Sequence, residues 1–397
     1  MSFAGRRPGD DGETGSSAED WADFVHTGPG TLAGRYLRLF WQPIYRAEEL
    51  EKGHAAPVKV MGEDFTLYRG EGGEAYLVEF RCAHRGAQLS IGRVEGEDLR
   101  CLYHGWKYDG EGRCVEQPAE VKPFCEKIRL KSYPVYEYLG LIFAYLGEGE
   151  PPAKPAFKEF EEEGVLLVPP PYVVPCNYFN QIDNNGDMHA PFLHWDMMDT
   201  SGSPRDYELA AEETDWGLSW SESHGATKRL SHFMMPNLLQ SKRVPMGKSG
   251  EWVNVLSWII PIDDEHHQRL EAYHGKATEE EARLYQERFE NLPRVPELGN
   301  AILAGKLRIE DVEDHNRSRV QIQDYLVLAG QGAIPDRSRE HFGRTDLVVL
   351  LCRKIWQREL RALAEGRPLK PWKRPERLAG YHELVKAGSP VRERQLR

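Results

Sequence analysis

Residues 81–108 read RCAHRGAQLSIGRVEGEDLRCLYHGWKY and contain two short motifs that each join a cysteine to a histidine. The first motif is Cys82-Ala83-His84 and the second is Cys101-Leu102-Tyr103-His104, with sixteen residues between them. The spacing predicts two loops that project from one β scaffold, each ending in a turn. Gly105, Gly110 and Gly112 are small enough to let the backbone come close to a bound inorganic group.

The two motifs together offer two thiolates and two imidazoles, which predicts one [2Fe–2S] cluster per chain. Neutral imidazoles on one iron remove negative charge and raise the reduction potential of such a cluster to roughly −150 to +300 mV. A zinc site is the alternative, although its ligand spacings often differ from these, and coincidence is a second one. Four further cysteines have no such partner and are predicted to be buried thiols: Cys114, Cys125, Cys176 and Cys352.

Short predicted strands surround the motifs from about Leu37 to Leu146, separated by turns rich in glycine. We therefore predict an all-β domain over residues 36–150, after a flexible N-terminal segment and lead-in over residues 1–35. The stretch from Gly147 to Pro171 is crowded with Pro and Glu, and residues 151–171 are predicted to be a linker. A second domain is expected over residues 172–370, followed by a basic, loosely held tail over residues 371–397.

The second domain has a different pattern. Residues 180–198 favour a helix, residues 214–262 favour antiparallel strands, residues 278–291 favour a charged helix, and residues 346–366 favour an amphipathic helix. Strands with segregated helices predict an α+β class for this domain.

The composition narrows the class of protein. The 397 residues carry a net charge of −12 and no basic tract, which argues against nucleic acid as a partner. We see no apolar run long enough to cross a membrane and no apolar stretch near residue 1 typical of a signal peptide. The expectation is a cytoplasmic protein whose few cysteines are reduced.

The block from Arg81 to Tyr108 resembles the Rieske domain of ring-hydroxylating oxygenase α subunits, in particular those of the phthalate dioxygenase and aromatic O-demethylase group. The resemblance covers nearly the whole chain beyond about residue 35. It implies a catalytic domain of the helix-grip type, an antiparallel sheet with helices, that holds one mononuclear Fe(II) per chain.

Two histidines and one carboxylate on one face would hold that iron and leave positions open for O₂. His189 and His194 are five residues apart. Pro191 lies between them and predicts an irregular helix, because proline has no backbone N–H to donate. The resemblance assigns the carboxylate to Asp324, in the stretch Gln321-Ile322-Gln323-Asp324-Tyr325. Asp336 and Asp346 are the competitors, interpreted as a turn residue and a charge at a helix N-terminus.

The family also has an aspartate that carries electrons from the cluster of a neighbouring subunit to the iron. The resemblance assigns this role to Asp187, with Asp183 as the fallback. Only Met188 separates Asp187 from His189, where the family pattern has two residues. Losing one residue rotates the following part of a helix by about 100° and could turn Asp187 away from His189. Both aspartates therefore remain candidates for the electron-carrying residue.

The resemblance implies a terminal oxygenase that receives electrons from NAD(P)H through a reductase, directly or through a ferredoxin, and that forms a homo-oligomer, expected to be a trimer. The substrate would be a small substituted aromatic that is hydroxylated or dealkylated at O or N; cis-dihydroxylation of a ring is the alternative. A Rieske electron carrier without oxygenase chemistry and a structural zinc module are alternatives of other classes. Arg205, Lys228 and Arg229 are candidates for binding an anionic group. The predicted pocket-lining residues, which ordinary core packing would explain equally well, are Phe192, Met198, Phe233, Met235 and Trp258.

Overall fold

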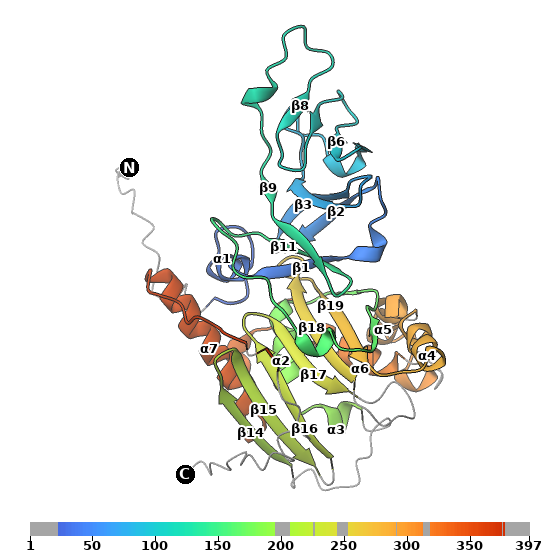
Figure 1. The fold of residues 1–397 in the computed structure, drawn as a ribbon. Helices are drawn as coiled ribbons and strands as arrows, with labels where there is room; N and C mark the ends of the chain where they lie inside the picture. The colour runs from blue at the N-terminus through green and yellow to red at the C-terminus, as the bar shows by residue number, and fades with distance from the viewer. Residues whose placement is uncertain are drawn as a thin grey trace, which may run out of the picture.

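The computed structural model describes residues 23–194, 207–224, 227–243, 253–290, 292–312, 318–374 and 376–377. It has two parts: an N-terminal β domain stands at one end of a larger domain built from a sheet and helices (Figure 1). The α+β class predicted from the sequence is confirmed. No helix within the described ranges combines the length and the apolar character needed to cross a membrane.

The N-terminal domain consists of three small antiparallel sheets. The first has the order β1-β11-β10, the second β2-β3-β4-β9 and the third β5-β6-β7-β8. The two cysteine–histidine motifs flank β5 and β6 of the third sheet. The strands are β1 (Trp41–Arg46), β2 (Ala55–Val60), β3 (Glu63–Arg69), β4 (Ala75–Glu79), β5 (Arg93–Glu95), β6 (Asp98–Arg100), β7 (Lys107–Tyr108), β8 (Cys114–Glu116), β9 (Ser132–Tyr133), β10 (Val135–Tyr138) and β11 (Leu141–Tyr145).

The second domain is built on one large antiparallel sheet with the order β12-β19-β18-β17-β16-β15-β14, and β13 also pairs with β19. The predicted strands between residues 214 and 262 are present, but the sheet continues beyond the turn at residues 261–264 into β19. Its strands are β12 (Val165–Leu167), β13 (Val173–Val174), β14 (Glu208–Glu213), β15 (Gly217–His224), β16 (Thr227–Met234), β17 (Leu238–Arg243), β18 (Val253–Pro261) and β19 (His267–Gly275).

Side chains alternate between the two faces of a strand, so the pairing register fixes which residues share a face. Across the four central strands, Phe233 pairs with Leu239, Leu239 pairs with Ser257, and Ser257 pairs with Glu271. These four residues therefore lie on one face of the sheet. Val255 and Tyr273 lie on this same face, where they pack against Ile322 and Tyr325 of a helix.

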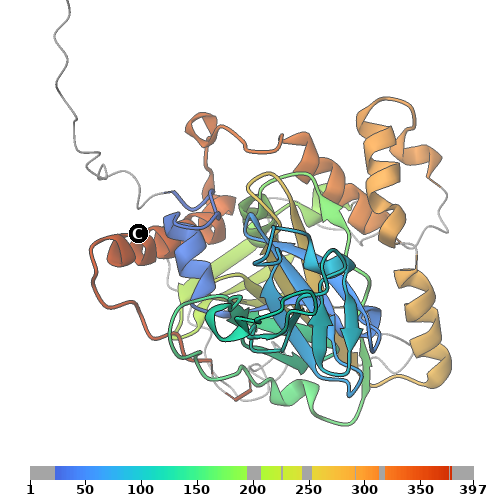
Figure 2. The same cartoon turned by 90° about the horizontal axis from the view of Figure 1, so that it is seen from above.

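Helices cover that face. Helix α2 contacts β18 and α7, and α7 contacts β14 and β15. Seen from above, α7 lies on one side of the large sheet, and α4 and α5, coloured orange, lie on the other side (Figure 2). The helix predicted over residues 180–198 is interrupted, because Asp187 is extended with φ −92° and ψ 165° and a new short helix begins at Ala190, with Pro191 in its first turn. The α-helices are α1 (Leu32–Arg38), α2 (Tyr178–Gly186), α3 (Ala190–Leu193), α4 (Glu279–Phe289), α5 (Val295–Leu303), α6 (Arg319–Gly330) and α7 (Leu347–Ala364).

The opposite face of the sheet meets the N-terminal domain and the linker. Trp258 makes edge contacts with Phe143 of β11 and Phe157 of the linker, with ring centroids 5.4 and 5.8 Å apart. The amides of residues 61 and 62 donate to the carbonyls of residues 261 and 262, each at 2.8 Å. Lys59 also pairs with Asp263 at 2.7 Å. Trp258, predicted to line a pocket, is thus part of the core between the two domains, because its place on β18 turns it away from α6.

Both terminal segments pack against the rest of the fold over their described parts. In the predicted N-terminal lead-in, Phe24 stacks on Phe179 of α2. In the predicted tail, Trp372 donates to the Tyr36 hydroxyl at 2.9 Å, and Arg374 pairs with the buried Glu159 of the linker. Residues 23–35 and 371–374 are therefore integral to the fold, a packing that their polar sequence did not predict.

Candidate metal centres

The two cysteine–histidine motifs form a matched pair of turns, one before β5 and one after β6. In the first, the amide of Gly86 donates to the carbonyl of Cys82 at 2.9 Å; in the second, the amide of Gly105 donates to that of Cys101 at 3.1 Å. Both glycines have positive φ, 72° and 75°, which a residue with a side chain rarely adopts. The sequence spacing therefore produces two loops of the same shape, as predicted.

The loops bring their side chains together. The rings of His84 and His104 lie 4.4 Å apart, and His84 stacks on Trp106 at 4.5 Å with an interplanar angle of 8°. Cys82 and Cys101 are buried, whereas both histidines are partly exposed. Burial, followed by the nearby thiol of Cys101, raises the pKa of Cys82 although Tyr108 hydrogen-bonds to its sulfur at 3.1 Å.

The donor set fits a [2Fe–2S] cluster. Two soft thiols lie inside and two imidazoles lie toward the solvent, which matches a cluster with one iron on each pair. The Nδ1 atom of His84 is buried and has no hydrogen-bond partner among the described residues. A buried nitrogen left without a partner is unfavourable, so this atom is placed as a ligand to a metal would be.

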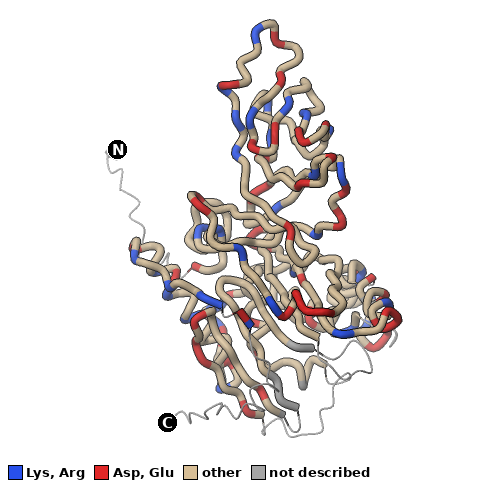
Figure 3. Tube along the Cα trace, in the orientation of Figure 1, with Lys and Arg blue, Asp and Glu red and all other residues tan. Residues whose placement is uncertain are grey.

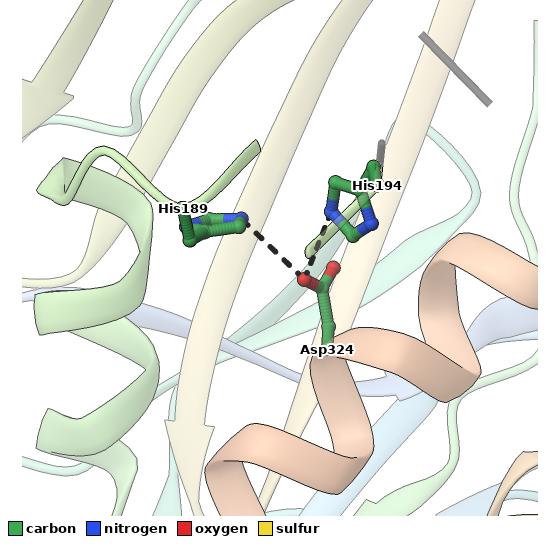
Figure 4. Close-up of side chains that lie close together, drawn as sticks. All are labelled: His189, His194 and Asp324. Carbon is green, nitrogen blue, oxygen red and sulfur yellow. Dashed lines mark ion pairs between the residues drawn. The ribbon is translucent and has the colours of Figure 1, made fainter. Parts of the chain in front are cut away.

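A second group forms below the sheet from residues far apart in the sequence (Figure 4). His189 and His194 flank α3, and Asp324 lies on α6. The Nε2 atoms of the two histidines lie 3.5 and 3.3 Å from the same carboxylate oxygen of Asp324. One ligand atom from each of the three side chains lies within 4.8 Å of the others. The structure thus brings together the three residues predicted from the sequence.

The hydrogen bonds of the two Nδ1 atoms show which protonation state the histidines have and what the group of three side chains can bind. His194 Nδ1 donates to Gln323 Oε1 at 2.7 Å, and His189 Nδ1 donates to the Asp187 carboxylate. Both partners are acceptors, so in neutral rings the protons are on Nδ1 and the lone pairs of Nε2 point at Asp324. Two lone pairs and a carboxylate oxygen that converge repel one another unless a cation lies between them. The group therefore fits a metal ion.

The electrostatics of Asp324 support this interpretation. Burial alone would raise the pKa of Asp324, but the positive charges around it lower it: His194 and His189 contribute when their rings are protonated, and Arg269 contributes in either state. The carboxylate is consequently in the charged form that binds metals. Its Oδ1 atom is buried and accepts no well-formed hydrogen bond among the described residues.

The two candidate bridging aspartates have different surroundings. Asp187 contacts His189, and 36% of its side chain is exposed. Asp183 has 16% of its side chain exposed and binds Arg353 of α7 through two hydrogen bonds of 3.1 and 2.6 Å. The interruption of the helix after Gly186 separates them, so Asp187 lies at the metal group and Asp183 at the contact between α2 and α7.

The other predicted residues have mixed positions. Phe233 lies on the face of the sheet that is turned to α6, Phe192 is exposed on α3, and Met235 is buried just after β16. Met198 and Arg205 lie outside the described residues, as do the side chains of Lys228 and Arg229. Asp336 caps a turn and Asp346 accepts from the amide of Gly343, which agrees with the interpretation of these competitors.

Sequence reasoning missed the supporting residues. Gln323 directly precedes Asp324, and that adjacency was the only signal for its bond to His194, a residue 129 positions away. Trp106, which stacks on His84, and Tyr108, which contacts Cys82, follow directly after the second motif.

The comparisons with known proteins agree with this geometry. Residues 40–134 match the family described as the Rieske [2Fe-2S] domain. The chain is 29% identical over 371 residues to the 5,5'-dehydrodivanillate O-demethylase oxygenase subunit of Sphingobium sp. (strain NBRC 103272 / SYK-6), covering 88% of this chain and 82% of the relative.

Two solved structures share the fold. Pseudomonas putida CBB5 NdmA superposes with a TM-score of 0.64 at 22% identity, covering 84% of this chain and 93% of its own. The oxygenase in a complex of carbazole 1,9a-dioxygenase with ferredoxin gives a TM-score of 0.61 at 20% identity, covering 87% of this chain and 95% of its own.

Proposed function

The chain belongs to the Rieske-type oxygenases, and we propose that it is the terminal oxygenase component that oxidises a substituted aromatic compound with O₂. The observation that carries the proposal is the convergence of His189, His194 and Asp324 in a chain that also has the two cysteine–histidine turns. A Rieske electron carrier needs only the turns. The second group of ligands therefore favours an oxygenase over a carrier.

The proposed cluster ligands are Cys82, His84, Cys101 and His104. When bound, the cluster supplies single electrons at the potential typical of this ligand set. Because the thiols are buried and the imidazoles are partly exposed, electrons would pass through the histidine side. Trp106 holds the ring of His84 flat against the domain.

The proposed ligands of Fe(II) are His189, His194 and Asp324. Two histidines and a carboxylate on one face leave positions where an iron activates O₂. Gln323 and Asp187 fix the two rings by accepting from Nδ1, so both Nε2 atoms stay turned toward the metal position. Gln323, like His194, is buried, which keeps water from competing for this bond.

Asp187 is our proposal for the residue that connects this site to a neighbouring subunit. Its carboxylate contacts His189 and is partly exposed, so a second imidazole from another chain can reach it. Asp183 is committed to Arg353 and is not available for that role. The proposal implies a homo-oligomer, expected to be a trimer.

The names of several relatives support an aromatic substrate, whereas one relative is named as a tert-butanol monooxygenase / tert-amyl alcohol desaturase oxygenase subunit. Several are named for oxygenases of aromatic compounds, among them an O-demethylase and a phthalate 4,5-dioxygenase. We propose hydroxylation or O- or N-dealkylation of a small substituted aromatic, with ring cis-dihydroxylation as the second candidate that the dioxygenase names favour. Phe233, on the face turned to α6, and Phe192 and Met235 are proposed to contact the ring.

Electrons would come from NAD(P)H through a reductase, directly or by way of a ferredoxin, as the solved oxygenase–ferredoxin complexes illustrate for their own proteins. We propose that the activity is cytoplasmic, where NAD(P)H would be available. Along the chain, Lys and Arg residues alternate with Asp and Glu residues in both domains, and the tube shows no long run of positive residues (Figure 3).

Metal content tests the proposal. The purified protein should be brown and bind about three irons per chain, two in the cluster and one mononuclear. Cys101→Ala should lose the visible absorption of the cluster, whereas His194→Ala should keep it and lose O₂ uptake coupled to aromatic ethers and acids. A colourless protein with stoichiometric zinc would overturn the proposal, and so would full activity in both variants.

A further inference from the structure

The face of the large sheet that is turned to α6 carries polar residues among apolar ones. Ser231 pairs directly with Ser241, and Ser257 pairs directly with Glu271. Ser241 and Ser257 are diagonal neighbours, since Ser241 pairs with Val255 two residues earlier on β18. All four polar residues are buried, so they form one continuous patch across β16 to β19.

Two hydroxyls of this patch have no hydrogen-bond partner among the described residues. Ser241 and Ser257 are 4% and 1% exposed, and their Oγ atoms have no hydrogen bond within the described part of the chain. Leaving a buried hydroxyl without a partner is unfavourable. An alanine at either position would avoid this unfavourable free energy, so the stability of the fold does not account for the two serines.

The patch faces the proposed iron site. Arg269 lies on the same face as Glu271, two positions before it on β19, and its charge acts on Asp324. Val255, the direct neighbour of Ser241, packs in one cluster with Ile322 and Tyr325, which flank Asp324 on α6. The sheet and the three metal-binding side chains thus lie across from each other, with the serines on the facing side.

The charges select the kind of group that fits. Arg269 is buried between Glu271 and Asp324, so its positive charge is already matched. A carboxylate on the ligand would be unfavourable here, because two neutral serines beside a glutamate do not offset its negative charge. A hydroxyl on the ligand suits the patch better, because each serine can both donate to it and accept from it. Diagonal neighbours lie roughly 7–8 Å apart, so one oxygen between them can reach both.

We propose that Ser241 and Ser257 form a subsite that binds a hydroxyl substituent of the aromatic substrate. This inference rests on the proposed function and narrows its substrate class to phenols that carry a second, oxidisable substituent. The hydroxyl anchors the ring on the sheet and leaves the other substituent toward His189, His194 and Asp324.

Matched ligands test the subsite. Calorimetric titrations of the metal-loaded protein without O₂ would compare 2-methoxyphenol, methoxybenzene and 2-methoxybenzoate. We expect the phenol to bind more tightly than the other two. Ser241→Ala and Ser257→Ala should each reduce the preference for the phenol over methoxybenzene by about 3- to 10-fold. Ser219→Ala is the control, because Ser219 is a buried strand serine on the opposite face, bonded to His232 at 2.7 Å, and it should leave the preference unchanged.

Thermal melting of the ligand-free proteins separates binding from structure. The Tm of Ser241→Ala and Ser257→Ala should equal or exceed that of the wild type, since neither hydroxyl has a hydrogen bond to a described residue, whereas Ser219→Ala should melt lower because it loses its bond to His232. A lower Tm for both test variants would show that the hydroxyls are bonded within the protein and would overturn the subsite. So would an unchanged preference in both variants, tighter binding of the benzoate, or no binding of any probe.

The two proposals fail in different ways. Equal binding of all probes together with coupled O₂ uptake would remove the subsite and leave the oxygenase. Binding that depends on the hydroxyl and on both serines, without O₂ uptake in the presence of a surrogate reductase, would remove the oxygenase and leave a phenol-binding site.

Discussion

Replacing Gln323 by leucine should weaken the mononuclear metal site without unfolding the protein. Gln323 Oε1 accepts from His194 Nδ1 at 2.7 Å, and both side chains are buried, so water cannot replace the lost acceptor. A buried donor left without a partner costs about 1–3 kcal/mol. The ring of His194 can recover this free energy by turning its N–H elsewhere, which removes Nε2 from the metal position. At about 1.4 kcal/mol per factor of ten, we expect metal affinity to fall about 5- to 140-fold.

The assay is an anaerobic titration of the chelator-treated protein with Fe(II), in which the visible absorption of the cluster shows that the N-terminal domain is intact. Gln323→Glu keeps an acceptor at the same position and should restore affinity. Gln321→Leu is the matched control, because Gln321 is also buried on α6 but its Oε1 atom accepts no hydrogen bond from any described residue. Wild-type affinity in Gln323→Leu, or an equal loss in Gln321→Leu, would refute the reasoning.

Three further changes test other parts of the structure. Asp187→Asn should keep both metal centres but slow the oxidation of a pre-reduced cluster in single turnovers with substrate and O₂; oxidation at the wild-type rate would exclude Asp187 as the bridge. Asp183→Asn should instead lower the free energy of unfolding by about 3 kcal/mol, since it leaves the charge of Arg353 less compensated in the protein interior, and denaturant titration measures this; unaltered stability would contradict the burial of the pair. Burial alone would raise the pKa of Asp263, but hydrogen bonds from Lys59 and its own loop lower it to about 2. The folded-state pKa is thus below the unfolded value of about 3.9, so the stability gained from this contact should be complete above about pH 4 and fade as the pH falls toward 2. The Tm difference between wild type and Asp263→Asn should shrink over that window, and a difference that does not change with pH would show that the contact between the domains does not depend on this charge.

The cysteine and histidine side chains of both sites could be predicted from the sequence, because within each site they are close together along the chain. Cys82 and His84 share one turn, as do Cys101 and His104, and the glycine that closes each turn lies within it. His189 and His194 are likewise held by a single short helix. Spacing alone is informative in such cases, since the backbone between two ligands has few conformations.

Other features depend on contacts between elements that are far apart in the sequence, and no local pattern predicts these contacts. Trp258 and Ser257 are adjacent on β18, yet one packs against the N-terminal domain and the other faces α6, and an apolar strand buried on both sides gives no sign of which is which. The bond between Gln323 and His194 joins two elements whose relative position is set by the whole domain. Asp324 was found through the resemblance of its surroundings, not through any pattern of its own.

The order of the two sites along the chain has a consequence for assembly during synthesis. Every strand of the N-terminal domain lies between residues 41 and 145, so its sheets and both cysteine–histidine turns can be complete while later residues are still being made. The proposed mononuclear site cannot form before Asp324 is made, and the contact of Arg374 with Glu159 forms later still. If both proposed centres are present, the protein can therefore mature in two stages, in which assembly of the cluster on the cysteine–histidine turns precedes binding of the single iron.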